Sequence, residues 1–380
     1  MGSLAGENIF VTEISTLAHL QSITERYLSE EEENQSEFEE LLSFIDENNI
    51  MSNRNTLLAF SSYISHMSLV RSHMKNDIQK RVLKIIDTLF TKYHLNEHFE
   101  QITIFNVFNK NKNTLLYLHQ HQKINIVNLF SRLSYAMKRK IVNYFLPEMK
   151  AAKVDIDDYI KDNQYIKTHG MKQVEKNKYS RYMKDRNGCH SEDPVAQLIR
   201  NDDIDEFIKY ITNEGIEINS TIESSGFEIN DDLNQSLSLI EYASAFGSVK
   251  IFKYLLLNTT ELSSSLLRYA IIGENSEIIT LLEEKNFEYD MECLCIALKY
   301  HTKLSYYTDK IPLEIDLVPK YLQNYNFDLL QNKYKVIFKK EIIAKAITTS
   351  IKEELISVLN FIFKQKTVDI NDKVVENTFS

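Results

Sequence analysis

The chain has 380 residues, 43% of them hydrophobic and 26% charged, a balance that fits a globular protein and excludes wholesale disorder. Its 8 glycines and 4 prolines are too few for folds rich in tight turns, so the composition favours helices over hairpin-rich sheets. The formal net charge of −10 argues against phosphate-backbone binding as the main activity, so we do not expect nucleic acid as a partner.

The length predicts two domains, because a single hydrophobic core rarely grows to this size. Three cysteines are too few for a disulfide framework and indicate a reducing compartment. The N-terminus lacks the features of a signal peptide, and no run of about 18 apolar residues could span a membrane. We therefore expect a cytoplasmic location, with the nucleus as an alternative, and no membrane association.

Residues 1–35 contain the acidic run Glu30 to Glu33 and are expected to form a flexible, acidic N-terminus. Residues 36–165 show helical periodicity, which places their apolar side chains on one face of each helix. Two such faces are Phe38, Leu41, Leu42 and Ile45, and Ile78, Val82, Ile85, Ile86 and Leu89, the second with Lys80, Arg81 and Lys84 expected on the opposite side. This segment is predicted to be an antiparallel helical array.

A basic segment at 166–192 has few aliphatic residues and is the predicted domain boundary. Its cations are Lys172, Lys176, Lys178, Arg181, Lys184 and Arg186. A solvated linker or an exposed helix is the simplest interpretation. The alternatives are a nuclear-import signal, a patch for an acidic partner and a salt-dependent contact with nucleic acid.

An internal repeat follows the basic segment. Tyr242-Ala243 recurs as Tyr269-Ala270, 27 positions later, and Ala297 follows Ala270 at the same interval. Ile251 and Leu255 lie 8 and 12 positions after Ala243, and Ile278 and Leu282 lie at the same offsets after Ala270. Small alanines let helices approach closely, and the aliphatic residues fill the layer between stacked helix pairs. The residues assigned to the repeat core are Ala196, Ile204, Ile208, Ala243, Gly247, Ile251, Leu255, Ala270, Ile278, Leu282, Ala297 and Ala346.

These residues resemble the ankyrin repeat. Leu239 to Leu256 match its pattern best, with Gly247 at the turn between the helices. Gly215 to Asn219 and Val368 to Asn371 look like the ending that leads to the next unit. The T-P-L-H opening is absent, and the 27-residue spacing is shorter than the usual spacing of about 33. The whole is similar to the degenerate ankyrin proteins of parasitic protists such as trichomonads, which pair a helical N-terminal region with divergent repeats.

The resemblance implies an ankyrin-like α-solenoid over residues 193–375, which binds a protein partner through its repeat surface. A tail at 376–380 follows the solenoid. Wider spacings of 47 and 49 residues between the outer alanines imply an insert, Thr221 to Gln235, and an extra helix pair between Leu313 and Leu330. Because the short units leave little room for finger loops, the face of the first helices and the insert are the expected contacts. The acidic residues of the insert, the candidate contact residues, are Glu223, Glu228, Asp231 and Asp232. A loop without a functional role is the alternative.

No pattern for chemistry is found. Clustered glycines that could hold a phosphate are missing, which excludes a P-loop and a dinucleotide fingerprint. His94 and His98 lack the H-E-x-x-H order of a zinc site and are interpreted as surface histidines. Cys293 and Cys295 are expected to pack between repeats, and the neighbours Cys189 and His190 alone do not make a catalytic pair.

We therefore expect no catalytic, cofactor-binding or metal-binding residues and no small-molecule substrate. The leading hypothesis is a non-enzymatic scaffold or adaptor. The alternative is that the repeats target an unidentified activity in the N-terminal helical domain.

Overall fold

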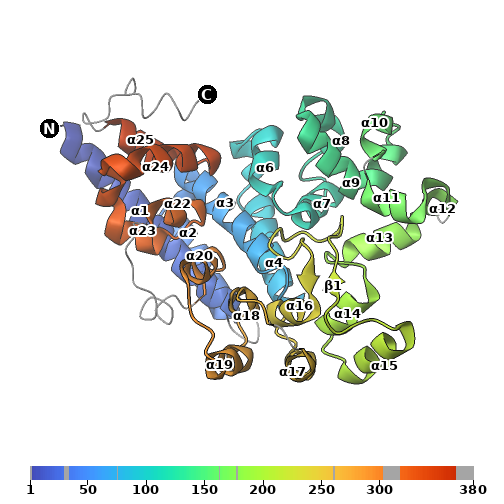
Figure 1. Cartoon of the computed structure of the whole chain (residues 1–380). Helices are drawn as coiled ribbons and strands as arrows, with labels where there is room; N and C mark the ends of the chain where they lie inside the picture. The colour runs from blue at the N-terminus through green and yellow to red at the C-terminus, as the bar shows by residue number, and fades with distance from the viewer. Residues whose placement is uncertain are drawn as a thin grey trace. The chain divides into compact units, whose positions relative to one another are not determined.

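A computed structural model describes residues 2–29, 34–74, 76–161, 163–176, 179–259, 262–302 and 317–364. Helix accounts for 72% of the chain and strand for 1%, which confirms the all-α class (Figure 1). The chain divides into two compact units. Unit 1 comprises Met1–Ser68, Lys75–His98 and Ala297–Ser380, and unit 2 comprises Leu69–Met74 and Phe99–Ile296. The two ends of the chain thus share one unit, whereas the sequence suggested domains that follow one another along the chain.

Unit 1 is built from helices of both chain ends. Its elements are α1 (Gly2–Ser29), α2 (Gln35–Glu47), η1 (Ile50–Ser52), most of α3 (Arg54–Val70), α4 (Asn76–Thr91), α5 (Leu95–His98), α22 (Val318–Gln323), α23 (Phe327–Lys333), η3 (Tyr334–Phe338), α24 (Lys340–Lys352) and α25 (Ile356–Lys364). Helices α22 and α23 lie at the extra helix pair expected between Leu313 and Leu330, although residues 303–316 are outside the described residues.

The helix α1 explains why the two chain ends share a core. Residues 2–29, expected to be flexible, form one helix that packs against α2, α4, α23 and α25. Its residues Phe10, Ile14 and Leu17 are buried, and the Phe10 ring stacks on Phe361 with 4.0 Å between the ring centroids. Glu25 of α1 lies 2.8 Å from the His301 ring. Residues 2–29 are therefore helical and packed in unit 1, not flexible as the sequence suggested.

The helix faces expected in unit 1 are largely present. Phe38, Leu41 and Ile45 of α2 are buried, as are four of the five apolar residues named for α4. Arg81 differs from the expectation, because it is 2% exposed and donates a hydrogen bond to the Tyr27 carbonyl oxygen. A guanidinium can be buried where backbone carbonyls satisfy its donors.

Unit 2 begins with short helices and continues into regular helix pairs. Its elements are α6 (Gln101–Phe108), α7 (Lys112–Gln120), α8 (Ile126–Leu129), η2 (Phe130–Arg132), α9 (Tyr135–Ala151), α10 (Asp157–Ile160), α11 (Gln164–His169), α12 (Met171–Lys176), α13 (Ser180–Asn187), α14 (Pro194–Arg200), α15 (Ile204–Glu214), β1 (Thr221–Ile222), β2 (Leu237–Ser238), α16 (Leu239–Ala245), α17 (Val249–Asn258), α18 (Leu266–Gly273), α19 (Ser276–Glu284) and most of α20 (Met291–Lys299).

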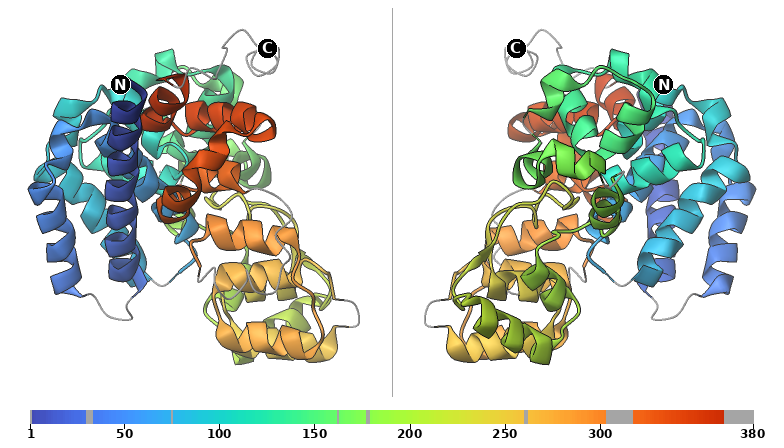
Figure 2. Two further views of the ribbon diagram at one scale, coloured as in Figure 1. Left: turned by 90° about the vertical axis from the view of Figure 1, so that its left-hand side faces the viewer. Right: turned by 90° about the vertical axis from the view of Figure 1, so that its right-hand side faces the viewer.

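Three helix pairs stack within unit 2. The pairs are α14–α15, α16–α17 and α18–α19. Among the first helices, α16 packs between α14 and α18, and among the second helices, α17 packs between α15 and α19. Figure 2 shows these yellow-green to orange pairs lying one beside the next. A single pair could not bury its apolar face alone, whereas stacked pairs share a continuous core.

The turns inside the pairs keep the 27-residue register. Gly247 and Glu274 both have positive φ, 63° and 50°. Each is followed by the N-cap residue of the second helix of its pair. That residue is Ser248 before α17 and Asn275 before α19. The Asn275 side chain accepts hydrogen bonds from two backbone N–H groups of α19, which satisfies donors that a helix start leaves free.

Gly273 sets the distance between the first helices α16 and α18. A Cβ placed on Gly273 would lie 2.2 Å from the Ser244 carbonyl oxygen and 3.2 Å from that of Ala245. Only glycine allows so close an approach of the two helices. The fully buried Ala243 and Ala270 lie on the same two helices.

Candidate protein-binding surface

The insert Thr221 to Gln235 is a folded part of unit 2. Its flanking strands β1 and β2 pair antiparallel, with Thr221 opposite Ser238 and Ile222 opposite Leu237. Phe227, at 0% exposure, is surrounded by the rings of Tyr144, Tyr165 and Tyr182, whose centroids lie 5.0 to 6.4 Å away. The insert therefore packs against α9, α11 and α13.

Glu228, one of the four candidate contact residues, is buried, with a side chain only 1% exposed. Both carboxylate oxygens lie 3.1 Å from Nδ1 of His190, and Oε1 accepts a hydrogen bond from the Asn230 N–H. The other ring nitrogen of His190 lies 3.1 Å from the Ser72 carbonyl oxygen. A buried carboxylate is costly unless it is paired. Glu228 thus joins the insert to His190, and its side chain is buried rather than exposed as a contact with a partner would require.

The turn Leu69–Met74 reaches the helix pairs from a distant part of the sequence. His73 Nε2 lies 2.7 Å from the Ile272 carbonyl oxygen, and Arg71 forms a 2.5 Å ion pair with Glu274. Burial lowers the pKa of His73 to about 3, so the ring is neutral at pH 7 and Nε2 donates to the carbonyl. Sequence reasoning missed these contacts, because nothing local relates residues about 200 positions apart.

The exposed part of the insert belongs to a row of carboxylates at the loops that precede the first helices. We call this row the acidic ridge and define it as Glu223, Asp232, Glu241, Asp290 and Glu292. All five residues are exposed or half-buried. Asp231 is also exposed, and its negative charge acts on the half-buried Lys112, whose pKa is lowered by burial.

Hydrogen bonds tie the acidic ridge to the neighbouring loops and to α18. Ser236 donates to Glu223 at 3.1 Å, and Ser265 donates to Glu241 at 2.6 Å. Gln235 of the insert donates to the Tyr269 hydroxyl of α18 at 3.4 Å. The ridge therefore runs from the insert across the first helices.

The guanidinium of Arg268 and the hydroxyl group of Tyr269 lie beside the carboxylates of the acidic ridge. Arg268 of α18 pairs with Asp290 at 2.5 Å and also with Glu292. Burial, followed by the negative charges of Glu241 and Asp232, raises the pKa of Tyr269 to about 12. The ridge thus holds five carboxylates and one guanidinium, which creates a negative potential over the first helices.

The residues assigned to the repeat core occupy the interior in most cases. Fully buried members are Ala196, Ala243, Ile251, Leu255, Ala270, Ile278, Leu282, Ala297 and Ala346. Ile204, Ile208 and Gly247 are half-buried. Ala297 and Ala346 belong to unit 1, whereas the other members belong to unit 2.

Two of the three cysteines, Cys189 and Cys293, are in surroundings that disfavour the nucleophilic thiolate. Burial raises the pKa of Cys189 to about 11 and that of Cys293 to about 12, so both are protonated thiols at neutral pH. Cys189 donates weakly to the Asn187 carbonyl oxygen, whereas the His190 ring lies between Glu228 and Ser72. The described residues contain no group of three or more His, Cys, Asp or Glu that could hold a metal ion.

The basic segment 166–192 is largely helical, as α11, α12 and α13 cover much of it. Arg186 is 1% exposed and forms a bidentate ion pair with Glu148, at 2.8 and 3.1 Å. The guanidinium also lies between the rings of Tyr144 and Tyr182. Arg186 therefore belongs to the core. Lys172, Lys176, Arg181 and Lys184 are exposed, and Lys178 lies outside the described residues.

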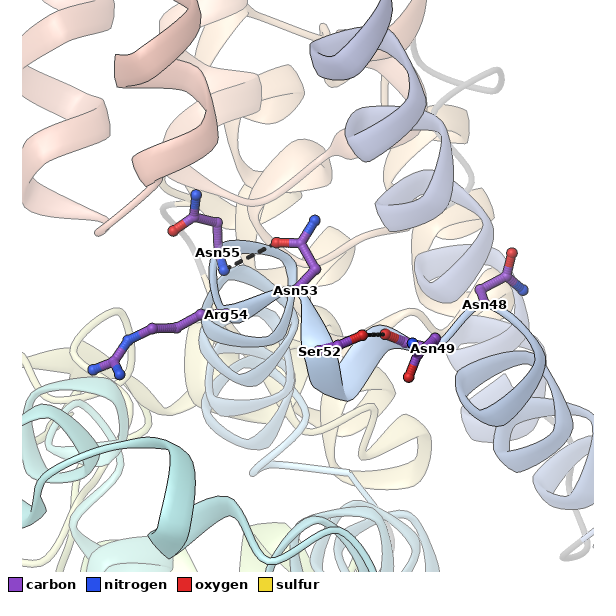
Figure 3. Close-up of a pocket in the computed structure, with 6 residues that line it drawn as sticks. All are labelled: Asn48, Asn49, Ser52, Asn53, Arg54 and Asn55. Atoms are coloured by element: carbon purple, nitrogen blue, oxygen red, sulfur yellow. Dashed lines mark hydrogen bonds between the residues drawn. The ribbon is translucent and has the colours of Figure 1, made fainter.

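The described residues of unit 1 line two open hollows. The first, of about 480 Å³, is lined by Asn48, Asn49, Ser52, Asn53, Arg54 and Asn55, at the turn between α2 and α3 (Figure 3). Asn53 accepts a hydrogen bond from the Asn55 N–H, which caps the start of α3. The second, of about 680 Å³, lies between α1, α2 and α23 and includes His19 and Asp328. Burial raises the pKa of Asp328.

Comparison with models of protein families, with curated proteins and with solved structures gave no match. Within the described residues, no helix combines the length and the apolar character needed to cross a membrane.

Proposed function

We propose that this chain is a protein-binding scaffold whose stacked helix pairs form an ankyrin-like array. The observation that carries the proposal is the recurrence of the helix pair at 27 residues. Helices α16 and α17 start 27 residues before α18 and α19, and the positive-φ turn residues Gly247 and Glu274 keep the same interval. A repeated pair builds an extended, rigid surface, which is suited to binding a protein rather than to enclosing a small substrate.

The acidic ridge is the surface that we propose for the partner. Its carboxylates lie on loops and helix starts that the stacked pairs hold in fixed positions. Such a surface is complementary to a partner that presents lysine or arginine. Its charge would raise the association rate more than the binding affinity. Glu223 and Asp232, two of the four residues expected from the sequence, remain part of this proposal, and Asp231 lies next to it.

Affinity purification of the full-length chain, followed by mass spectrometry, tests the proposal. The full chain is needed because the fragment 193–380 would lose α1 and the Glu25–His301 contact within unit 1. The test variant combines Glu223→Lys, Asp232→Lys and Glu292→Lys. The control variant combines Asp205→Lys, Glu206→Lys and Glu214→Lys on α15, where all three side chains are also exposed.

We expect a specific partner that is retained by the control variant and lost by the ridge variant. Equal recovery by both variants would refute a role of the acidic ridge. A partner that is lost on substitution of Asn49 and Asn55, but is kept by the ridge variant, would favour the alternative in which residues of unit 1 carry the activity.

A further inference from the structure

The helices α12 and α13 form a basic hairpin with a buried inner face and an exposed outer face. Val174, Tyr182 and Arg186 point into unit 2 and are 6%, 1% and 1% exposed. Tyr182 donates a hydrogen bond to the Asn143 carbonyl oxygen, and Arg186 is paired with Glu148. These contacts fix the hairpin on α9.

The outer face of the basic hairpin carries four exposed cations. Lys172 and Lys176 are four residues apart on α12, and Arg181 and Lys184 are three residues apart on α13. Residues at these spacings lie on the same side of a helix. Arg181 lies 3.6 Å from Asp185 and remains 67% exposed. Among the described residues, Lys172, Lys176 and Lys184 form no ion pair. The hairpin therefore offers four exposed cations, of which only Arg181 lies beside a carboxylate among the described residues.

The charge around the hairpin opposes that of the whole chain. Residues 132–186 contain 14 lysines and arginines and 7 aspartates and glutamates, a local net charge of +7 in a chain of −10. The remaining residues therefore carry −17. Such a division attracts an anionic ligand to one region and repels it from the rest.

We propose that the basic hairpin docks an acidic peptide segment of a partner protein. This surface is distinct from the acidic ridge, so it goes beyond the proposed function. A short acidic segment needs to contact only the four cations, whereas a long nucleic acid is disfavoured by the net charge of −17 on the remaining residues.

Fluorescence anisotropy with the full-length chain tests this proposal. The probe is a fluorescein-labelled dodecapeptide of alternating glutamate and serine, titrated at 50 mM and at 300 mM salt. The test variant carries Lys172→Glu, Lys176→Glu and Lys184→Glu. The control carries Lys209→Glu, Lys250→Glu and Lys285→Glu, three exposed lysines at the second helices of the pairs. Both variants have the same net charge, and circular dichroism checks that both remain folded.

We expect the natural chain and the control variant to bind the peptide at 50 mM salt and to lose affinity at 300 mM salt. The test variant should bind about tenfold more weakly, because each reversal removes an attraction and adds a repulsion. The proposal is overturned if the peptide does not bind, if both variants lose affinity equally, or if a labelled poly(U) 12-mer binds more tightly than the peptide. None of these outcomes depends on the acidic ridge, so the two proposals fail separately.

Discussion

The substitution Gly273→Ala tests the close packing of the repeated helix pairs. The added Cβ would lie 2.2 Å from the Ser244 carbonyl oxygen, more than 1 Å inside the 3.4 Å at which ordinary contacts begin. Two more backbone atoms, the Ala245 oxygen and the Gly247 nitrogen, would each be 3.2 Å away. Backbone atoms of a packed helix cannot rotate aside, so α16 and α18 must separate. Overpacking of this kind costs about 1–3 kcal/mol.

Thermal and urea unfolding measure the effect of this change. A cost of about 1–3 kcal/mol lowers the melting temperature by roughly 3–10 °C in a unit of this size. Gly226→Ala is the matched control, because a Cβ there meets no atom within 4 Å. We expect the control to keep its melting temperature or to gain slightly through lower entropy of the unfolded chain. A Gly273→Ala protein as stable as the natural chain would refute the close approach of α16 and α18.

Three further predictions concern the contacts around the insert. Phe227→Ala should cost about 3–5 kcal/mol, because it empties the space between three tyrosine rings, and near-ultraviolet circular dichroism should show the loss. Glu148→Gln should cost about 3–5 kcal/mol in urea unfolding, because it leaves the buried Arg186 charge uncompensated. For His73, with a folded pKa of about 3 against 6.5 unfolded, the unfolded chain binds one more proton below pH 6.5. Stability should therefore fall by up to about 1.4 kcal/mol per pH unit from pH 6 toward pH 4, and His73→Gln should lack this part of the slope.

Controls separate these effects from general destabilisation. Ser224→Ala changes an exposed residue of the same insert and should leave the spectrum unchanged, so an equal change would contradict the role of Phe227. Glu206→Gln breaks an exposed ion pair and should have no measurable effect, in contrast to Glu148→Gln. A His73→Gln protein with the same pH slope as the natural chain would show that His73 does not remain neutral in the folded state.

The helices and the repeat could be predicted because their signals are local. The apolar faces of α2 and α4 and the alanines at 27-residue spacing depend only on neighbours within one or two helices. The same kind of signal existed for α1, in which Phe10, Ile14 and Leu17 have helical spacing. The acidic run Glu30 to Glu33 beyond α1 favours the opposite expectation of a flexible, solvated N-terminus.

The position of Glu228 could not be predicted, because its partners are remote in the sequence. His190 is 38 residues away, and the Ser72 carbonyl on the other side of the ring is 118 residues from His190. Charge alone placed Glu228 with the exposed acidic residues. Arg186 shows the same limit, since it belongs to a basic run but is paired with Glu148, 38 residues earlier. A charged residue is exposed by default, and only tertiary contacts can reverse that.

The insert explains why the first spacing of the repeat is 47 residues instead of 27. The pair α14–α15 follows the irregular helices α9 to α13, which do not offer the regular face that one repeat offers to the next. Phe227 fills the space among the tyrosines of α9, α11 and α13, while Glu228 pairs with His190 just before α14. The extra residues therefore connect the irregular helices α9 to α13 with the regular helix pairs. Of the acidic ridge, Glu223 and Asp232 belong to the outer edge of the insert. Shortening the insert should accordingly lower the stability of unit 2, which urea unfolding of the full-length chain would measure.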